Sequence, residues 1–298
     1  MEFEQSETVG NKDIADELEH VLEDIPPGEG YLPDRELQTS ILRELPENLV
    51  EELHGHIMAS EKEQRQIAAE LGKEFEAHPE DRVIRGELFE RLATLQYGRA
   101  GAEAQDPLLA EELSQELVQL MHNPERFALG PQIGHIRNPD LAFFRINDQG
   151  KVEIEAAGEA KLGFLDERAA KQIGGGFKKG IQRMVRAVNQ VEKPEDSGLT
   201  AVAQSRTRGG SLGVSEDLKV KLIVPADRNL DKKESLINRN NFQQGEDYDH
   251  LVELLQDESK IEILKSAFSR QEIAAMADHL LAKIRERYKS TPSSETLA

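Results

Sequence analysis

Two acidic residues and a lysine are spaced so that they could form a hydrolytic centre. Asp140 begins a predicted strand, Glu159 ends the next one, and Lys161 follows two residues later. A hairpin brings the start of its first strand beside the end of its second, so both carboxylates should lie at one end of a sheet. Carboxylate oxygens are ligands that Mg²⁺ prefers. Because side chains alternate along a strand, Lys161 should share a face with Glu159 and reach a metal-bound water.

This arrangement fits the hydrolysis of a phosphodiester bond. A bound metal ion polarises a phosphoryl oxygen and lowers the pKa of its water, while a nearby ammonium group stabilises developing negative charge. A lysine that acts as a general base needs a lowered pKa, but two neighbouring carboxylates raise it until a metal neutralises them. We therefore expect Lys161 to orient the water or stabilise charge, and not to act as the base.

The elements that must position these residues are predicted by the periodicity of the apolar residues. In chain order we expect a helix over residues 78–97, strands over 132–136, 141–146 and 152–159, a helical segment over 166–191, and a strand over 218–224. Asn147, Asp148 and Gly150 favour a tight turn between the second and third strands, since they accept positive φ angles. A glycine run that starts at Gly174 loosens the later helical segment. The order predicts an α/β fold.

A family resemblance follows from this pattern. A Pro-Asp pair ending at Asp140, then eighteen residues, then the tripeptide from Glu159 to Lys161 resemble the signature of the PD-(D/E)xK nuclease superfamily. The expected elements over about residues 80–225 are similar to its core, and its members include restriction endonucleases, Holliday-junction resolvases and DNA-repair exonucleases. The resemblance implies a restriction-endonuclease-like αβββαβ core. It also implies Mg²⁺-dependent cleavage of DNA, with Mn²⁺ as a substitute ion.

The resemblance extends to two further site residues. Residues 86–90 read Gly-Glu-Leu-Phe-Glu, similar to a Gly-x-x-Phe-Glu segment of restriction-endonuclease-like families, in which the glutamate approaches the metal. Glu90 is therefore implied as a metal ligand. A helical wheel places Glu90 nearly opposite the apolar stripe and Glu87 on its flank, so the choice between these two carboxylates stays open. Gln172, on the helix after the lysine, resembles a glutamine that some members carry there.

The specificity lies in the conjunction of these features, because acid-x-lysine tripeptides also begin at Asp217 and Asp231. Those tripeptides lack the Pro-Asp pair, the hairpin and the upstream helix segment. Two alternatives stay open: a catalytically degenerate member of the fold that binds nucleic acid or protein, and an acidic helical interaction module whose sheet is only a scaffold. Retention of all three motif residues disfavours the degenerate reading, whereas the negative charge favours the interaction module.

The charge is distributed unevenly along the chain. A formal net charge of −20 disfavours a nucleic-acid partner, since phosphates are bound chiefly by Lys and Arg. Residues 1–80, however, hold 22 acidic and 6 basic residues, whereas residues 161–240 hold 16 basic and 10 acidic ones. The basic segment includes a helical cluster of cations at Lys178, Lys179, Arg183 and Arg186. This cluster is either a solvated helix face or a phosphate-binding patch, and the acidic segment is either a solvated arm or a surface for a protein partner.

The expected organisation is an acidic, helical and partly disordered extension over residues 1–78, the nuclease-like core over 79–230, and a helical extension over 231–298. A capping box from Ser269 to Glu272 opens the last helix. The chain has no cysteine, which excludes disulfides and thiolate zinc sites and suits a cytoplasmic protein, and no apolar run is long enough to span a membrane. The histidines show no zinc-ligand spacing. A homodimer is compatible with cutting two strands, and DNA versus RNA and endonuclease versus exonuclease stay open.

Overall fold

The computed structural model describes most of the chain in segments. These are residues 12–28, 31–70, 80–98, 112–113, 116–117, 120, 139–146, 151–242 and 245–289. The chain forms two compact units, of which unit 1 comprises Met1–Leu92 and Ala267–Ala298 and unit 2 comprises Ala93–Ser266. Both ends of the chain therefore contribute to unit 1.

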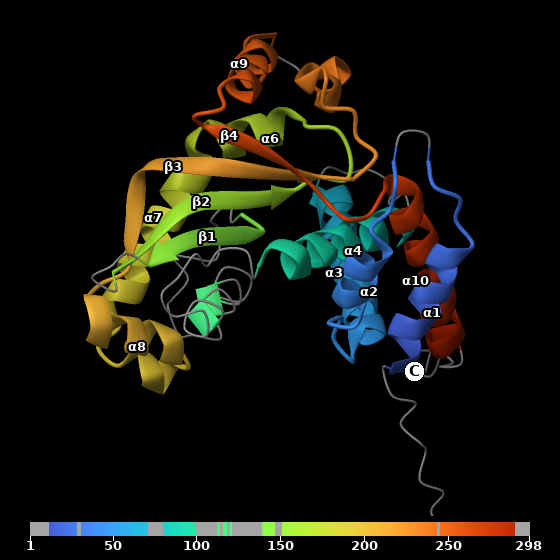
Figure 1. Ribbon diagram of the computed structural model, residues 1–298, viewed down its shortest axis with the longest axis horizontal. Helices are drawn as coiled ribbons and strands as arrows, with labels where there is room; N and C mark the ends of the chain where they lie inside the picture. Colours follow the sequence, from blue (N-terminus) through green and yellow to red (C-terminus); the bar gives the residue numbers. More distant parts are fainter. Residues whose placement is uncertain are drawn as a thin grey trace, which may run out of the picture. The chain divides into compact units, whose positions relative to one another are not determined.

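Unit 1 is built from helices. They are α1 (Lys12–Glu23), α2 (Arg35–Leu42), α3 (Leu49–Glu70), the first part of α4 (Glu80–Tyr97), and α10 (Arg270–Lys289). A turn that contains Pro46 separates α2 from α3, because proline cannot donate the backbone hydrogen bond of a continuous helix. Helix α1 contacts α10 (Figure 1), and both bury apolar residues, among them Leu18 and Leu280.

A buried polar network joins the N-terminal part of unit 1 to the start of α10. Glu272 accepts hydrogen bonds from the backbone N–H of Ser269 at 2.8 Å and from the guanidinium of Arg35 at 2.9 Å. The amide of Gln38 donates to the carbonyl oxygen of Ala267 at 2.7 Å. The hydroxyl of Ser269 in turn accepts from the N–H of Glu272, so the predicted capping box is present.

Unit 2 contains a four-stranded mixed sheet (Figure 1), which confirms the α/β class. The strands are β1 (Leu141–Ile146), β2 (Val152–Ala160), β3 (Gly213–Val224) and β4 (Ile261–Lys265), in that order across the sheet. The β1–β2 pair is antiparallel, as expected for a hairpin, and β2, β3 and β4 run parallel. The strand expected over residues 132–136 lies outside the described residues. Strand β4 lies in the segment for which we expected only helices.

The helical elements of unit 2 that follow β2 lie between β2 and β3 or between β3 and β4. They are α6 (Glu167–Lys171), the π-helical η2 (Gln172–Gly176), α7 (Phe177–Gln190), the 3₁₀ turn η3 (Pro194–Ser197), α8 (Thr200–Gly209), the 3₁₀ turns η4 (Lys233–Leu236) and η5 (Arg239–Asn241), and α9 (Gly245–Gln256). Gly175 has a φ of 131° within η2, so the glycine run interrupts the helix as expected. Helix α7 buries Phe177 and Ile181 in one core with Phe144, Ile154 and Leu222 of the sheet. Among the described helices, none is long and apolar enough to cross a membrane.

Candidate functional site

The predicted acidic pair lies at one end of the β1–β2 hairpin. Leu141 pairs with Gly158 across the hairpin, which places the preceding Asp140 opposite Glu159. The carboxylate Oδ2 of Asp140 accepts a hydrogen bond from the backbone N–H of Ala160, and the N···O distance is 2.7 Å. This bond fixes the Asp140 carboxylate beside the end of β2.

Glu159 is almost completely enclosed. Only 4% of its side chain is exposed, and Nζ of Lys161 lies 2.6 Å from its Oε1. Glu159 pairs with Leu222 of β3, whose side chain belongs to the core under the helices. The other carboxylate oxygen, Oε2, is buried and has no hydrogen-bond partner among the residues that the structure describes. Its pairing requires a group beyond the described residues.

Burial, and after it the negative charge of Asp140, raise the pKa of Glu159 to about 7, although the charges of Lys161 and Arg168 oppose the rise. At neutral pH and without a metal, the carboxyl group is therefore shared between its neutral and ionised forms. A cation bound by Glu159 would have to displace this proton. The negative charge of Asp140 disfavours ionisation of Glu159, so the two carboxylates interact electrostatically.

The backbone after β2 is held from two sides. The N–H of Lys161 donates to the carbonyl oxygen of Ile223 at 2.9 Å, which extends the β2–β3 ladder past the end of the strand. The guanidinium of Arg228 then donates to the carbonyl oxygens of Leu162 at 3.1 Å and Gly163 at 3.0 Å. Lys161 thus stands between two anchored stretches of backbone, which limits the positions its ammonium group can take.

Sequence reasoning missed two arginines that act here. Arg168, in α6, is exposed, and its positive charge lowers the pKa of Glu159. The sequence could have indicated the position of Arg168, because Asp166 is a typical N-cap residue and so predicts where α6 begins. In the structure the Asp166 side chain accepts a hydrogen bond from the backbone N–H of Ala169. Arg228 is buried at the turn after β3, and its guanidinium contacts the backbone that follows β2, 65 or more positions away in the sequence. No local sequence pattern indicates such a contact.

The two residues implied only by the resemblance belong to different units. Gln172 is the first residue of η2, and it is buried. Glu90 belongs to unit 1, where it lines a polar hollow of about 490 Å³ together with His56, Arg82 and Glu87. His56 Nδ1 lies 3.1 Å from the Oε2 of Glu87, and this hydrogen bond raises the pKa of the imidazole. The roles of Gln172 and Glu90 in a nuclease site stay predictions.

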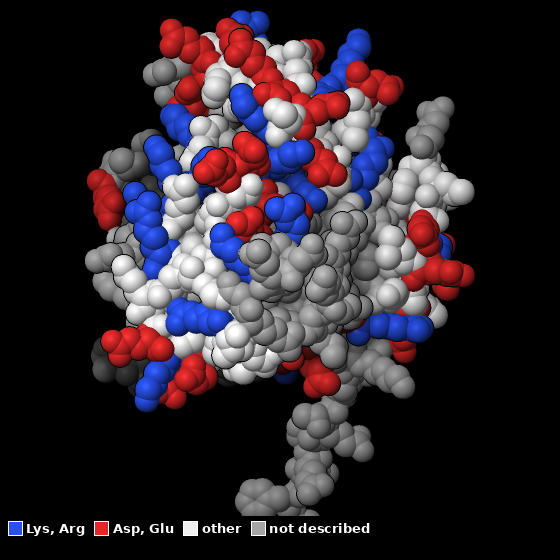
Figure 2. Space-filling view, turned by 60° about the vertical axis from the view of Figure 1, so that its left-hand side comes forward, with Lys and Arg blue, Asp and Glu red and all other residues white. Residues whose placement is uncertain are grey.

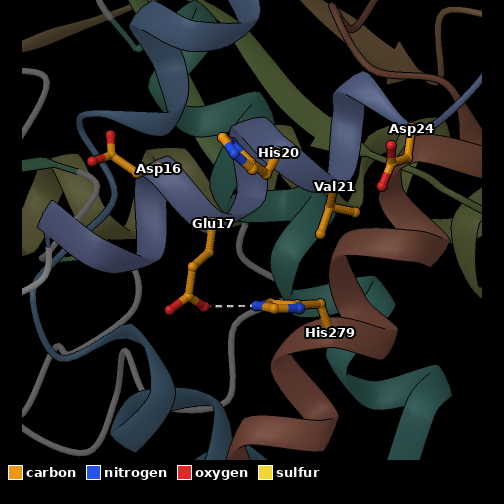
Figure 3. A pocket seen from close by; sticks show the side chains of 6 residues that line it. All are labelled: Asp16, Glu17, His20, Val21, Asp24 and His279. Carbon is orange, nitrogen blue, oxygen red and sulfur yellow. Dashed lines mark hydrogen bonds and ion pairs between the residues drawn. The ribbon is translucent and has the colours of Figure 1, made fainter.

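A second hollow of unit 1, of about 380 Å³, also gathers acidic residues and histidines. Figure 3 shows Glu17 of α1 pointing toward His279 of α10, and the two side chains are 2.7 Å apart. Burial opposes ionisation of Glu17, but hydrogen bonds from Lys283 and His279 lower its pKa below the ordinary value. These pairs tie the two helices together, and the hollow's other histidine, His20, is largely exposed.

The donors beside Glu159 fit Mg²⁺. Within the described residues, no group of three or more His, Cys, Asp or Glu side chains is gathered closely enough to hold a metal by itself. Mg²⁺ does not require such a cage, because it usually binds one or two carboxylates and completes its octahedron with water and substrate phosphate. Asp140 and Glu159 supply two carboxylates, and the unpartnered Oε2 of Glu159 is an oxygen that a cation would satisfy.

Comparison with known proteins adds no relative to this picture. No protein-family model, curated protein or solved structure matches the chain. The residues of the site therefore carry the functional inference by themselves.

Proposed function

We propose that this protein is a metal-dependent nuclease with a restriction-endonuclease-like core in unit 2, and that it hydrolyses phosphodiester bonds in DNA. The observation that supports the proposal most directly is the grouping of Asp140, Glu159 and Lys161 at the end of the β1–β2 hairpin, with Lys161 Nζ 2.6 Å from Glu159 Oε1. Two carboxylates and an ammonium group at this spacing suit metal binding and the stabilisation of a charged transition state.

In this proposal, Asp140 and Glu159 hold Mg²⁺, with Mn²⁺ as a substitute. The bound ion supplies positive charge on a phosphoryl oxygen and a water of lowered pKa. Because the pKa of Glu159 lies near 7, its carboxyl group would have to lose its proton to solvent in order to hold the ion. Nζ of Lys161 lies 2.6 Å from Oε1 of Glu159, so its ammonium group would lie close to a phosphate bound at these carboxylates. It would stabilise the negative charge that grows as the water oxygen, which loses its proton to solvent, bonds to phosphorus and the ester oxygen leaves and takes a proton from solvent.

The order of elements supports the proposed core. The described part of unit 2 runs strand, strand, helix, strand, and β3 returns parallel to β2 after the α6–α7 segment. This is the order that the resemblance implies downstream of the first expected strand. The site carboxylates lie at the end of β2, beside the end of β3, where a ligand can approach past the strand ends.

The exposed face of α7 supports the proposal that the substrate is a polyanion. Its four cations, Lys178, Lys179, Arg183 and Arg186, are all exposed, and the helix contains no acidic residue. Figure 2 shows many Lys and Arg side chains on this side of unit 2, interspersed with Asp and Glu. The net charge of −20 therefore does not describe the surface near α7. Exposed cations free of acidic neighbours on their own helix suit contacts with backbone phosphates.

A cleavage assay tests the proposal. The full chain is incubated with end-labelled single-stranded, duplex and branched DNA, and with RNA of the same sequence, in Mg²⁺, in Mn²⁺ and in EDTA. We expect metal-dependent cleavage of DNA that Asp140→Asn abolishes. The matched control is Asp231→Asn, which alters an exposed aspartate of another acid-x-lysine tripeptide and should leave the rate unchanged.

The proposal fails if no substrate is cut in either metal by protein that is folded. It also fails if Asp140→Asn cuts as fast as the parent protein, because the metal would then be held elsewhere or the activity would come from a contaminant.

A further inference from the structure

Two irregular elements of unit 2 meet at one groove. The first is the π-helical η2, whose Gly175 has a φ of 131°. The second is a bulge in β3: Val214 pairs with Ile154 of β2, but the next pair joins Lys219 to Ala156, so residues 215–218 stand opposite a single residue of β2. Single π-turns and bulges interrupt hydrogen-bond ladders and are frequent beside functional sites.

The groove between these elements has a volume of about 610 Å³. Its polar lining includes three lysines, one histidine and one serine: Lys178, Lys219, Lys260, His250 and Ser259. The floor is apolar, with Leu218 and Leu254 among its residues. Cations over an apolar floor suit a ligand that carries both phosphate and flat or apolar groups.

The backbone irregularities hold two of these side chains at the groove. The ammonium group of Lys178 donates to the carbonyl oxygen of Glu216 in the β3 bulge, at 2.6 Å. The imidazole of His250, on α9, approaches η2 so closely that its Nε2 would lie 3.4 Å from a Cβ at Gly174. A Cβ at that distance would be in ordinary van der Waals contact, so His250 packs directly against η2 at the groove.

The acidic residues of the groove do not cancel its cations. Lys178 is bonded to the carbonyl of Glu216 and not to its carboxylate. Lys219 is exposed and has no ion pair among the described residues, while Lys260 pairs with the half-buried Asp257 outside the lining. The lining acids, Glu216 and Asp217, are exposed, as are the three lysines, which outnumber them three to two.

We propose that this groove binds backbone phosphates of the nucleic-acid substrate a few nucleotides away from the bond that is cut. The inference rests on the proposed nuclease function and names a second contact region for its substrate. Lys178 belongs both to the groove and to the exposed cationic face of α7, so a strand can pass from one to the other. Leu218 and the lysine stems offer apolar surface to sugars or bases.

The position of the groove sets the expected spacing. Arg168, whose charge acts on Glu159, lies ten residues before Lys178 along the α6–η2–α7 segment. Ten residues of a straight α-helix would span ~15 Å, and the kink at Gly175 makes this an upper bound that corresponds to at most about five nucleotides of single strand. A substrate of only one or two nucleotides should contact the catalytic centre and miss the groove.

Equilibrium binding in EDTA tests the groove without cleavage. The probe is a fluorescein-labelled single-stranded 20-nucleotide DNA, titrated with the full chain at several salt concentrations. The variant Lys178→Ala/Lys219→Ala should bind about 10-fold more weakly at low salt, and the slope of log K against log salt should fall by about 1.4 for two lost phosphate contacts. Lys219→Ala alone keeps the bond from Lys178 to Glu216, and it should show about half of this change in slope.

The matched control is Lys193→Ala/Lys232→Ala, which removes two exposed lysines outside the groove and should change binding little. Equal losses in the two double variants, with unchanged thermal unfolding, would overturn the proposal. It would also fall if AMP or inorganic phosphate displaced the oligonucleotide from the groove at the same concentration as a competing 20-nucleotide strand, because the groove would then be a mononucleotide site. Cleavage is scored separately: weakened binding with no metal-dependent cleavage would contradict the nuclease function and keep the groove.

Discussion

Glu159 is an acid that the fold encloses while leaving one oxygen without a hydrogen-bond partner in the described part of the chain. Burial and the neighbouring Asp140 both raise its pKa, and Lys161 offsets only part of this effect, so the value reaches about 7. A glutamate with a purely structural role would cost the fold less free energy if it were exposed to water or fully hydrogen-bonded. A strongly perturbed acid beside a second carboxylate is typical of a site that binds a charged ligand.

Glu159→Gln should therefore stabilise the metal-free protein at high pH. A carboxyl group whose pKa rises from 4.5 to about 7 on folding contributes stability that is fully present below pH 4.5 and is lost as the pH rises to about 7. The shift corresponds to roughly 3 kcal/mol, and the neutral amide avoids this loss. We expect urea unfolding in EDTA to show a gain on the order of 1–3 kcal/mol at pH 8 and almost none at pH 4. An equal gain at both pH values would contradict the assigned protonation.

Lys161→Ala and Asp140→Asn should separate catalysis from metal binding. Lys161 is partly exposed near a strand end, so its loss should leave the fold and Mg²⁺ affinity nearly intact. Cleavage should fall by roughly 10²- to 10³-fold, as when one group that stabilises developing charge is removed. Asp140→Asn should lower both metal affinity and cleavage, because a charged ligand becomes neutral. Metal titrations and initial rates distinguish the two, and an undiminished rate in Lys161→Ala would remove the lysine from the mechanism.

At the scale of elements, a bulge decides which face Glu159 occupies. Strict alternation from Val152 through Ile154 would place Glu159 on the opposite face from these two residues. The register shifts at Glu155, so that Ile154 pairs with Phe144 while Ala157 pairs with Ala142. Val152, Ile154 and Ala157 then share one core, and Glu159 follows Ala157 onto that face.

The sequence predicted the hairpin and the spacing of its carboxylates, since turn residues and apolar alternation are local signals. It did not predict the bulge, because no residue type marks Glu155 as unpaired. Strand β4 was missed for a similar reason: its five residues include two charged ones, and it is a strand only because it pairs with β3. The contact of Arg228 with Leu162 is likewise set by tertiary structure.

Gly158→Ala should disturb the hairpin that positions Asp140. A Cβ at Gly158 would lie 2.8 Å from Cβ of Leu141 and 2.9 Å from the ring of Phe143. The strands must then separate, which weakens the bond from Ala160 N–H to Asp140. Overpacking of this kind costs about 1–3 kcal/mol, and cleavage should fall as well. Gly163→Ala is the control, since a Cβ there meets nothing within 4 Å, and equal behaviour of the two variants in thermal unfolding and cleavage would refute the close packing.

At the scale of the whole molecule, both ends of the chain build unit 1. The acidic excess of residues 1–80 suggested a solvated arm or a partner-binding surface. In the structure, several of these acids pair with cations of α10: Glu17 with Lys283, and Glu51 with Arg287. Composition alone could not reveal this, because the complementary cations lie more than 200 positions away in the chain. The helices of residues 12–70 also bury apolar side chains, so charge and core both contribute to the unit.

Deleting residues 1–78 should therefore unfold what remains of unit 1, and not merely remove a negative charge from the protein. Helix α10 contacts α1 and α3, and Glu272 at its start loses Arg35 and Gln38, which leaves a buried acid without its cation. Removing one partner of a fully buried charged pair costs about 3–5 kcal/mol, and the loss here is smaller because 38% of the Arg35 side chain is exposed. We expect α10 to become rapidly cleaved by trypsin at its lysines and arginines, and the thermal unfolding of the truncated chain to lose amplitude.

Deletion of residues 1–11 is the control, because it removes three acids and none of the described contacts. If the chain lacking residues 1–78 keeps the parent's trypsin resistance across α10, the N-terminal helices are dispensable and unit 1 does not depend on both ends of the chain.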